Sequence, residues 1–110
     1  MTFSVLRNTR QFNQVYKKGK SIVNRHVVMY YKKNQLGYNQ VGFSVSKKVG
    51  KAVVRNRVKR LMKESFRLNE EKLIQGYDIV FVARVRCKDS SYKEIEKAML
   101  NCFKSGKLMR

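Results

Sequence analysis

The stretch Tyr77-Asp-Ile-Val-Phe-Val-Ala-Arg84 decides the fold, because its middle is an unbroken apolar run of strand length. Strands that are apolar on both sides usually lie in the middle of a sheet, where other elements cover both faces. We therefore predict that residues 77–84 form a central, buried strand.

Two amphipathic helices flank this strand in the sequence. At 100° per residue, the helix predicted over residues 52–68 gathers its apolar side from Val54, Val58, Leu61, Met62, Ser65 and Leu68. The second helix begins at the capping box Ser91-Tyr-Lys-Glu94, and its buried stripe is predicted to comprise Ile95, Ala98, Met99, Cys102 and Phe103.

The N-terminal half adds one helix and two strands. Asn8 and Gln11 predict a capping box, and Gly19 stands where a left-handed C-terminal cap is expected. Residues 21–32 and 41–45 are predicted to be strands, paired as an antiparallel hairpin. The expected order is α-β-β-α-β-α in one α+β domain, residues 1–110, with a mixed sheet. The default crossover is right-handed.

Charge indicates the class of partner. The chain has 26 Lys and Arg residues against 7 Asp and Glu, a net charge of +19. Such a charge destabilises the compact state by self-repulsion, and a polyanion would neutralise it. We therefore expect a nucleic-acid partner. The alternative is a basic protein that is merely soluble and adhesive.

The positive charge is concentrated at the start of one helix. Nine basic residues lie between Lys47 and Arg67, a span of 21 residues, and the other 17 are spread over 89 residues. Cations at a helix start oppose the macrodipole, so we interpret the cluster as a phosphate-binding site. Arg55 and Arg57 offer planar donor forks, and Asn56 suits a base edge or 2′-hydroxyl. The alternative is a solvated helix face.

The segment Val49-Gly-Lys-Ala-Val-Val-Arg-Asn-Arg-Val-Lys-Arg-Leu61 resembles the Arg-Asn-Arg signature of the bacterial ribonuclease P protein. The preceding Gly42-Phe-Ser-Val-Ser-Lys-Lys48 is similar to the strand that leads into that signature. Phe12-Asn-Gln-Val-Tyr-Lys-Lys-Gly19, Asn24-Arg-His-Val-Val-Met-Tyr30 and Asp78-Ile-Val-Phe-Val-Ala-Arg84 match other elements of the family. The resemblance covers most of the chain.

The resemblance implies a protein subunit that assists a catalytic RNA in removing the 5′ leader of precursor tRNA. Mg²⁺ would act through the RNA subunit, with one protein per RNA and neither catalytic nor metal-binding residues in this chain. It also implies a two-layer sandwich with a left-handed β-α-β crossover, like the second domain of a small-subunit ribosomal protein. The residues matched to catalytic-RNA binding are Lys47, Lys48, Lys51, Arg55, Asn56, Arg57, Lys59 and Arg60.

The resemblance further implies that Phe12, Tyr16 and Tyr30 bind the single-stranded leader of precursor tRNA. Exposed rings can stack on unpaired bases. By spacing alone, however, Phe12, Val15 and Tyr16 favour a core stripe. His26 and the residue after it stand where relatives often have a bulkier aromatic.

The sequence shows no pattern that would indicate a different class of function. The seven acids and the single His26 form no recognisable catalytic pair, which argues against a protein-only nuclease. Cys87 and Cys102 predict neither a disulfide framework nor a zinc site. No apolar run approaches the roughly 20 residues of a membrane span, and no secretion signal begins the chain, so we expect a cytoplasmic protein. A ribosomal or chaperone-like RNA-binding protein is the alternative function.

Overall fold

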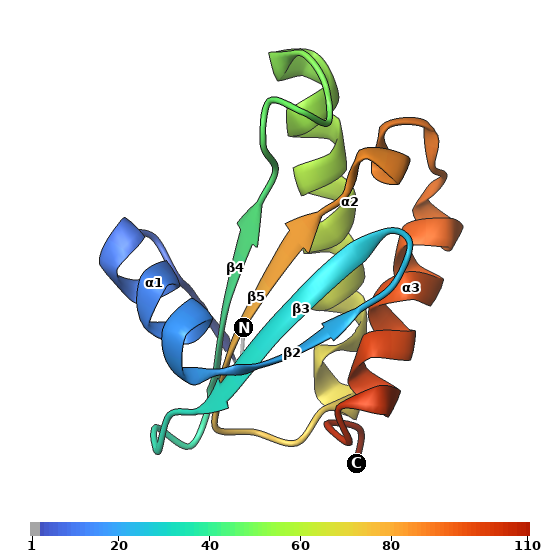
Figure 1. The fold of residues 1–110 in the computed structure, drawn as a ribbon. Helices are drawn as coiled ribbons and strands as arrows, with labels where there is room; N and C mark the ends of the chain where they lie inside the picture. The colour runs from blue at the N-terminus through green and yellow to red at the C-terminus, as the bar shows by residue number, and fades with distance from the viewer. Residues whose placement is uncertain (1–2) are drawn as a thin grey trace.

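The predicted central strand lies in the middle of the sheet. The computed structural model describes residues 3–110, and β5 (Tyr77–Ala83) is the third strand of a five-stranded sheet, in which Ile79, Val80 and Phe81 are buried. The spatial order is β1-β4-β5-β3-β2 (Figure 1). The other strands are β1 (Phe3–Val5), β2 (Lys20–Val23), β3 (Val27–Lys33) and β4 (Asn39–Ser44).

The predicted antiparallel hairpin of residues 21–32 and 41–45 is wrong. Strand β5 lies between β3 and β4, antiparallel to β3 and parallel to β4. The central position buries both apolar faces of β5, which an edge position would leave exposed. Residues 21–32 also divide into two strands. The side-chain oxygen of Asn24 accepts from the backbone N–H groups of His26 and Val27, both at 3.0 Å, and this Asx turn separates β2 from β3.

The β4-α2-β5 crossover is left-handed, as the resemblance implies. Viewed with both strands pointing up, β4 lies to the left of β5 and the connecting helix α2 (Ala52–Asn69) passes behind the sheet (Figure 1). The right-handed default is therefore wrong here. The face that a right-handed connection would use is covered by α1 (Thr9–Lys18), which contacts β3 and β5.

The main core lies between the sheet and helices α2 and α3 (Tyr92–Ser105). Phe43, Phe66, Phe81 and Phe103 are buried there with their rings in contact. All five residues of the predicted α3 stripe are buried. Two short 3₁₀ segments, η1 (Glu70–Lys72) and η2 (Val85–Asp89), follow α2 and β5.

The predicted apolar side of α2 is partly wrong. Val58, Met62 and Ser65 are buried as expected, but the stripe continues through Phe66 and Asn69. Leu68 is 53% exposed, because two residues beyond Phe66 correspond to about 200° of rotation around the helix.

Gly19 follows α1 in an extended conformation, with φ −87° and ψ 167°, so the predicted left-handed cap is wrong. A glycine is needed for a different reason. A Cβ at this position would lie 2.6 Å from the carbonyl oxygen of Val15 and 2.8 Å from that of Tyr31. Glycine thus allows the end of α1 to turn tightly against β3.

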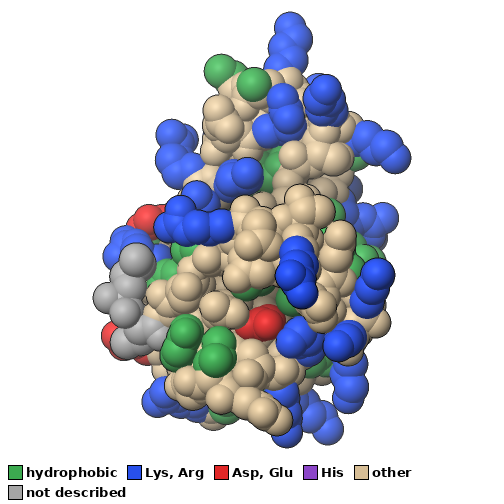
Figure 2. Space-filling view, turned by 90° about the vertical axis from the view of Figure 1, so that its left-hand side faces the viewer, with side chains coloured by type: hydrophobic (Ala, Val, Ile, Leu, Met, Phe, Trp, Pro, Cys, Tyr) green, Lys and Arg blue, Asp and Glu red, His purple; other side chains and the backbone are tan. Residues whose placement is uncertain are grey.

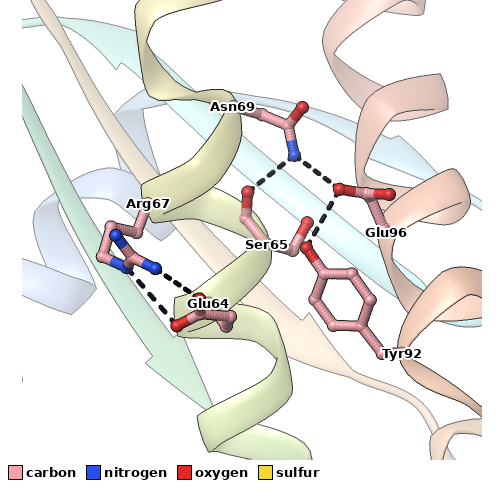
Figure 3. A network of polar contacts seen from close by, with 6 residues as sticks. All are labelled: Glu64, Ser65, Arg67, Asn69, Tyr92 and Glu96. Atoms are coloured by element: carbon pink, nitrogen blue, oxygen red, sulfur yellow. Dashed lines mark hydrogen bonds and ion pairs between the residues drawn. The ribbon is translucent and has the colours of Figure 1, made fainter.

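A polar network joins α2 to α3 (Figure 3). The side-chain amide of Asn69 donates to the Ser65 carbonyl oxygen at 2.8 Å and to Glu96 Oε2 at 2.9 Å. The Tyr92 hydroxyl donates to the same Glu96 oxygen at 3.0 Å. Burial and this hydrogen bond raise the pKa of Tyr92 to about 12, so the phenol stays protonated and, within α3, donates to the carboxylate that accepts from Asn69 of α2.

Candidate nucleic-acid interface

Helix α2 begins without a side-chain cap. Lys51 is its N-cap residue, no side chain accepts a hydrogen bond from the first turn, and that turn contains no acidic residue. The first N–H groups of a helix have no partner within the helix. At the start of α2 they are therefore available to an anion, and the N-terminal end of the helix dipole favours one.

The loop before α2 holds its lysines outward. The backbone N–H of Val49 donates to the carbonyl oxygen of Ser46 at 3.1 Å, and the Val49 side chain is buried. This anchored turn leaves Lys47 and Lys48 exposed next to Lys51.

We call the eight residues matched to catalytic-RNA binding the basic helix start. All eight side chains are exposed or half-buried. Its exposed members are Lys47, Lys48, Lys51, Asn56 and Arg60. The half-buried members are Arg55, Arg57 and Lys59. Lys and Arg side chains crowd the upper end of the molecule in Figure 2, the end that in Figure 1 holds the loop before α2 and its first turns.

Two arginines of the basic helix start differ in how the chain holds them. Arg57 Nη2 donates to the carbonyl oxygen of Ser90 at 3.0 Å, which fixes its guanidinium beside η2. Arg55 Nε is buried, and none of residues 3–110 accepts a hydrogen bond from it. An unsatisfied buried donor destabilises a protein, and a phosphate could reach this one only after the Arg55 side chain turned outward.

The contact between Arg57 and Ser90 also brings further cations to this end. Arg84, Arg86 and Lys88 are exposed in and next to η2, which contacts α2. Sequence reasoning missed them as site residues. Their alternation directly after the central strand was the available signal, since β5 runs parallel to β4 and both strands end on the side where α2 begins.

The aromatic face, our name for Phe12, Tyr16 and Tyr30, lies where α1 covers the sheet. The ring centroids of Tyr16 and Tyr30 are 4.9 Å apart at 74°, and those of Phe12 and Tyr16 are 6.4 Å apart at 72°. Phe12 lies on Gly42, where a Cβ would be 2.5 Å from its Cζ atom. A residue other than glycine there would push the ring away.

The predicted stripe on α1 combines one buried residue, Val15, with the half-buried rings of Phe12 and Tyr16. Val15 is buried against Leu6 and Val80, as a core stripe requires. The three rings are only half-buried. Burial raises the pKa of Tyr16, although a hydrogen bond with the Ser44 side chain opposes this shift.

A pocket of about 310 Å³ opens beside the start of α1. Besides Phe12 and Tyr16 it is lined by Arg7, Asn8, Thr9 and Asn13. Two rings of the aromatic face, those of Phe12 and Tyr16, thus border a hollow that also presents a cation and amide groups. This combination can receive a base and its phosphate.

The acids, the histidine and the two cysteines are the other residue types that could bind a metal ion. Within residues 3–110, no group of three or more His, Cys, Asp or Glu residues lies close enough to bind a metal ion together. Burial raises the pKa of the Cys87 thiol to about 11 and that of Cys102 to about 12, so both are unreactive core residues. No helix among these residues is both long and apolar enough to cross a bilayer.

The chain is similar to known proteins over nearly its whole length. The family model described as Ribonuclease P matches residues 2–107. The ribonuclease P protein component of Alkaliphilus oremlandii is 56% identical over 104 residues, or 94% of this chain and 91% of that protein. That of Clostridioides difficile is 54% identical over 100 residues, 90% and 88% of the two chains.

Solved structures show the same fold. The RNase P protein of Staphylococcus aureus, at 33% identity, superposes with a TM-score of 0.88 over 96% of this chain and 97% of that one. The RNase P protein from Thermotoga maritima, also at 33% identity, gives 0.82 over 89% and 93%. These likenesses extend over nearly the whole fold, including the left-handed crossover that sets the basic helix start beside the sheet. The chain therefore belongs to the family of bacterial ribonuclease P protein components.

Proposed function

We propose that this chain binds the catalytic RNA of ribonuclease P through the basic helix start and the 5′ leader of precursor tRNA through the aromatic face. As a member of its family, the chain is part of an endoribonuclease complex. The observation that carries the proposal is the start of α2, where an uncapped helix end is surrounded by accessible cations.

The basic helix start is suited to the RNA backbone. Exposed lysines neutralise phosphates and release counterions. Arg57 is already oriented by Ser90, so less side-chain freedom is lost when its remaining donors meet a phosphate. Arg55 is half-buried, and its Nε atom, which has no acceptor within residues 3–110, would gain one if the side chain turned toward the RNA.

Catalysis is proposed to reside in the RNA subunit, with Mg²⁺ held by RNA phosphates. No residues of this chain are assigned to the metal. The contribution of the protein is electrostatic and positional: one subunit per RNA would lower the repulsion between two polyanions and hold the leader in place.

The aromatic face is proposed to distinguish precursor from mature tRNA. A single-stranded leader has unpaired bases that can stack on Tyr16 and Tyr30, at about 1–3 kcal/mol per base. Mature tRNA has no leader and would gain nothing from this surface. The half-exposed state of the three rings supports this role.

The decisive experiment reconstitutes this protein with its catalytic RNA at low Mg²⁺. We expect faster cleavage of precursor tRNA, tighter substrate binding and a lower Mg²⁺ requirement than with RNA alone. No change in any of the three would refute the proposal. Cleavage by the protein alone, free of RNA, would refute the assignment of catalysis to the RNA.

A substitution tests the leader role separately. Tyr16→Ala is expected to weaken binding of precursor tRNA by about 1–3 kcal/mol and to leave mature tRNA binding unchanged, because it removes a stacking ring. Equilibrium titration of the reconstituted complex measures both affinities. An equal loss for the two substrates would contradict the role of the aromatic face.

A further inference from the structure

A second hollow with aromatic and basic walls lies outside both proposed surfaces. The lysine pocket, as we call it, has a volume of about 330 Å³ and is lined by Lys18, Lys20, Tyr31, Lys32, Lys33 and Tyr77. It is built where the last residue of α1, the first residues of β2 and β5, and the end of β3 meet.

An incomplete strand pairing creates this pocket. Strand β2 begins at Lys20, which is opposite Tyr31, so β3 has no partner on that side beyond Tyr31. On its other side β3 stays paired as far as Lys33, which is opposite Tyr77. The turn at Gly19 brings the end of α1 against the Tyr31 carbonyl group. Lysines from three elements therefore converge at an open sheet edge.

The charge of the pocket is largely uncompensated. Lys32 Nζ lies 3.4 Å from Asp78 Oδ2, and Asp78 also accepts a hydrogen bond from Asn34. The other three lysines, at positions 18, 20 and 33, are exposed, and none of them forms an ion pair within residues 3–110. One carboxylate thus faces four ammonium groups.

The aromatic lining adds a surface for a base. The ring centroids of Tyr31 and Tyr77 are 6.3 Å apart with 47° between their planes, and both side chains are half-buried. Rings that are fixed on one side and open on the other can stack on any base, while neighbouring lysines contact the phosphates. The lining therefore matches a nucleotide better than a simple anion.

The position of the pocket indicates which RNA segment would reach it. Strand β4 runs toward the start of α2, and the parallel strand β5 begins at Tyr77, so the lysine pocket and the basic helix start lie at opposite ends of the sheet. Lys32 follows Tyr30 on the same face of β3, which α1 also covers. Tyr31, Lys33 and Tyr77 lie on the opposite face, where both rings pack against the main core. The pocket therefore opens around the end of the sheet edge, and Lys32 and Lys18 form its wall nearest to the aromatic face.

We propose that the lysine pocket binds a nucleotide of the single-stranded 5′ leader that lies farther from the cleavage site than those on the aromatic face. The inference rests on the proposed leader role of that face and extends the path of the leader past Lys32 and around the end of β3 to the opposite face of the sheet. A long leader would thus contact two aromatic surfaces, whereas a short one would end before the pocket.

The test compares leader lengths in the reconstituted complex. Precursors with leaders of about 4 and about 12 nucleotides, within the site sizes of single-strand binders, are titrated with wild type and with the double variant Lys20→Ala/Lys33→Ala. We expect about tenfold weaker binding of the long-leader precursor and a salt slope lower by about 1.4. Short-leader binding should be unchanged. The matched control is Lys93→Ala/Lys97→Ala, two exposed lysines on α3, which should alter neither.

A second variant separates stacking from charge. Tyr77→Leu keeps every lysine but removes one ring, so long-leader affinity should fall about fivefold without a change in salt slope. Its melting temperature is measured alongside, because Tyr77 also packs against the main core.

Two outcomes would overturn the inference. An equal loss for both leader lengths would place the lysines against the RNA subunit instead. Unchanged affinity with increased self-association would show that they only protect an open sheet edge. The leader role of the aromatic face is checked independently: wild type must bind the short-leader precursor more tightly than mature tRNA.

Discussion

Helices α2 and α3 pack on the same face of the sheet but begin in opposite ways. At α3, Ser91 Oγ accepts from the Glu94 N–H at 3.2 Å and Glu94 Oε1 accepts from the Ser91 N–H at 2.9 Å. These bonds hold the pKa of Glu94 below its usual range. Helix α2 starts at Lys51 with neither cap nor acid. The chain satisfies its own donors at α3, whereas among residues 3–110 no side chain caps those at the start of α2.

The largest expected effect comes from removing a positioned cation at α2. Arg57→Ala should weaken association with the catalytic RNA about tenfold to hundredfold, because charge-assisted hydrogen bonds contribute about 1.5–3 kcal/mol. The salt slope should fall by about 1. Binding titrations over a range of salt concentrations measure both.

Arg57→Lys is the matched control for this prediction. It keeps the charge but loses the planar fork, so the salt slope should stay and the affinity should fall only partly. Because Arg57 also binds the Ser90 carbonyl group, stability is measured in parallel. Reduced stability with unchanged RNA affinity would make Arg57 a purely structural contact.

Giving α2 an N-cap like that of α3 should make the protein more stable and its RNA binding weaker. Lys51→Asp supplies an N-cap acceptor and an anion at the positive end of the dipole, which should stabilise the protein by about 1 kcal/mol. The same change should weaken RNA binding, because a cation is replaced by an anion. Thermal unfolding and RNA titration test the two signs, and tighter RNA binding would contradict the role of this helix end.

Removing the N-cap of α3 should lower the stability of the protein and leave its RNA affinity unchanged. Ser91→Ala is expected to lower the free energy of unfolding by about 1 kcal/mol, because the Glu94 N–H loses its acceptor. RNA affinity of the folded protein should not change. Denaturant unfolding measures the first effect, and a matching loss of RNA affinity would show that the two helix ends are not distinct in function.

The smallest effect concerns the hydrogen bond from Tyr92 to Glu96 within α3. Tyr92→Phe should cost about 1 kcal/mol near neutral pH, since Glu96 loses a donor. The pKa of Tyr92 is raised to about 12 in the folded chain, from about 10 in an unfolded one. This stabilisation is complete below pH 10 and is lost as pH rises to 12. The difference between wild type and variant should therefore shrink over that interval, and a constant difference would contradict it.

Local signals in the sequence predicted the helices well. Both capping boxes form as predicted, because their donors and acceptors are three residues apart in sequence. The α3 stripe and the central place of β5 follow from periodicity and from an uninterrupted apolar run. These features depend only on neighbouring residues.

Features set by distant parts of the chain were not predictable in this way. The strand next to β3 was misassigned because β5, some 40 residues later, competes for the same edge. The crossover hand depended on α1 covering the other face, and only the family resemblance indicated it. Charge density in the sequence predicted the cluster at the start of α2, and the structure places these cations at an accessible helix end, while their role in binding stays a prediction. Those of η2 were missed because the fold, and not the sequence, brings them there.

The left-handed crossover has a consequence for the shape of the sheet. It puts α2 on the same side as α3, so among residues 3–110 the ten residues of α1 are the only α-helix on the opposite side of five strands. A connection of the other hand would have filled that side with α2. The incomplete third layer is where Tyr16 and Tyr30 remain half-exposed. Stacked bases would finish this layer, so part of what serves as a core in other proteins would here be supplied by the RNA itself.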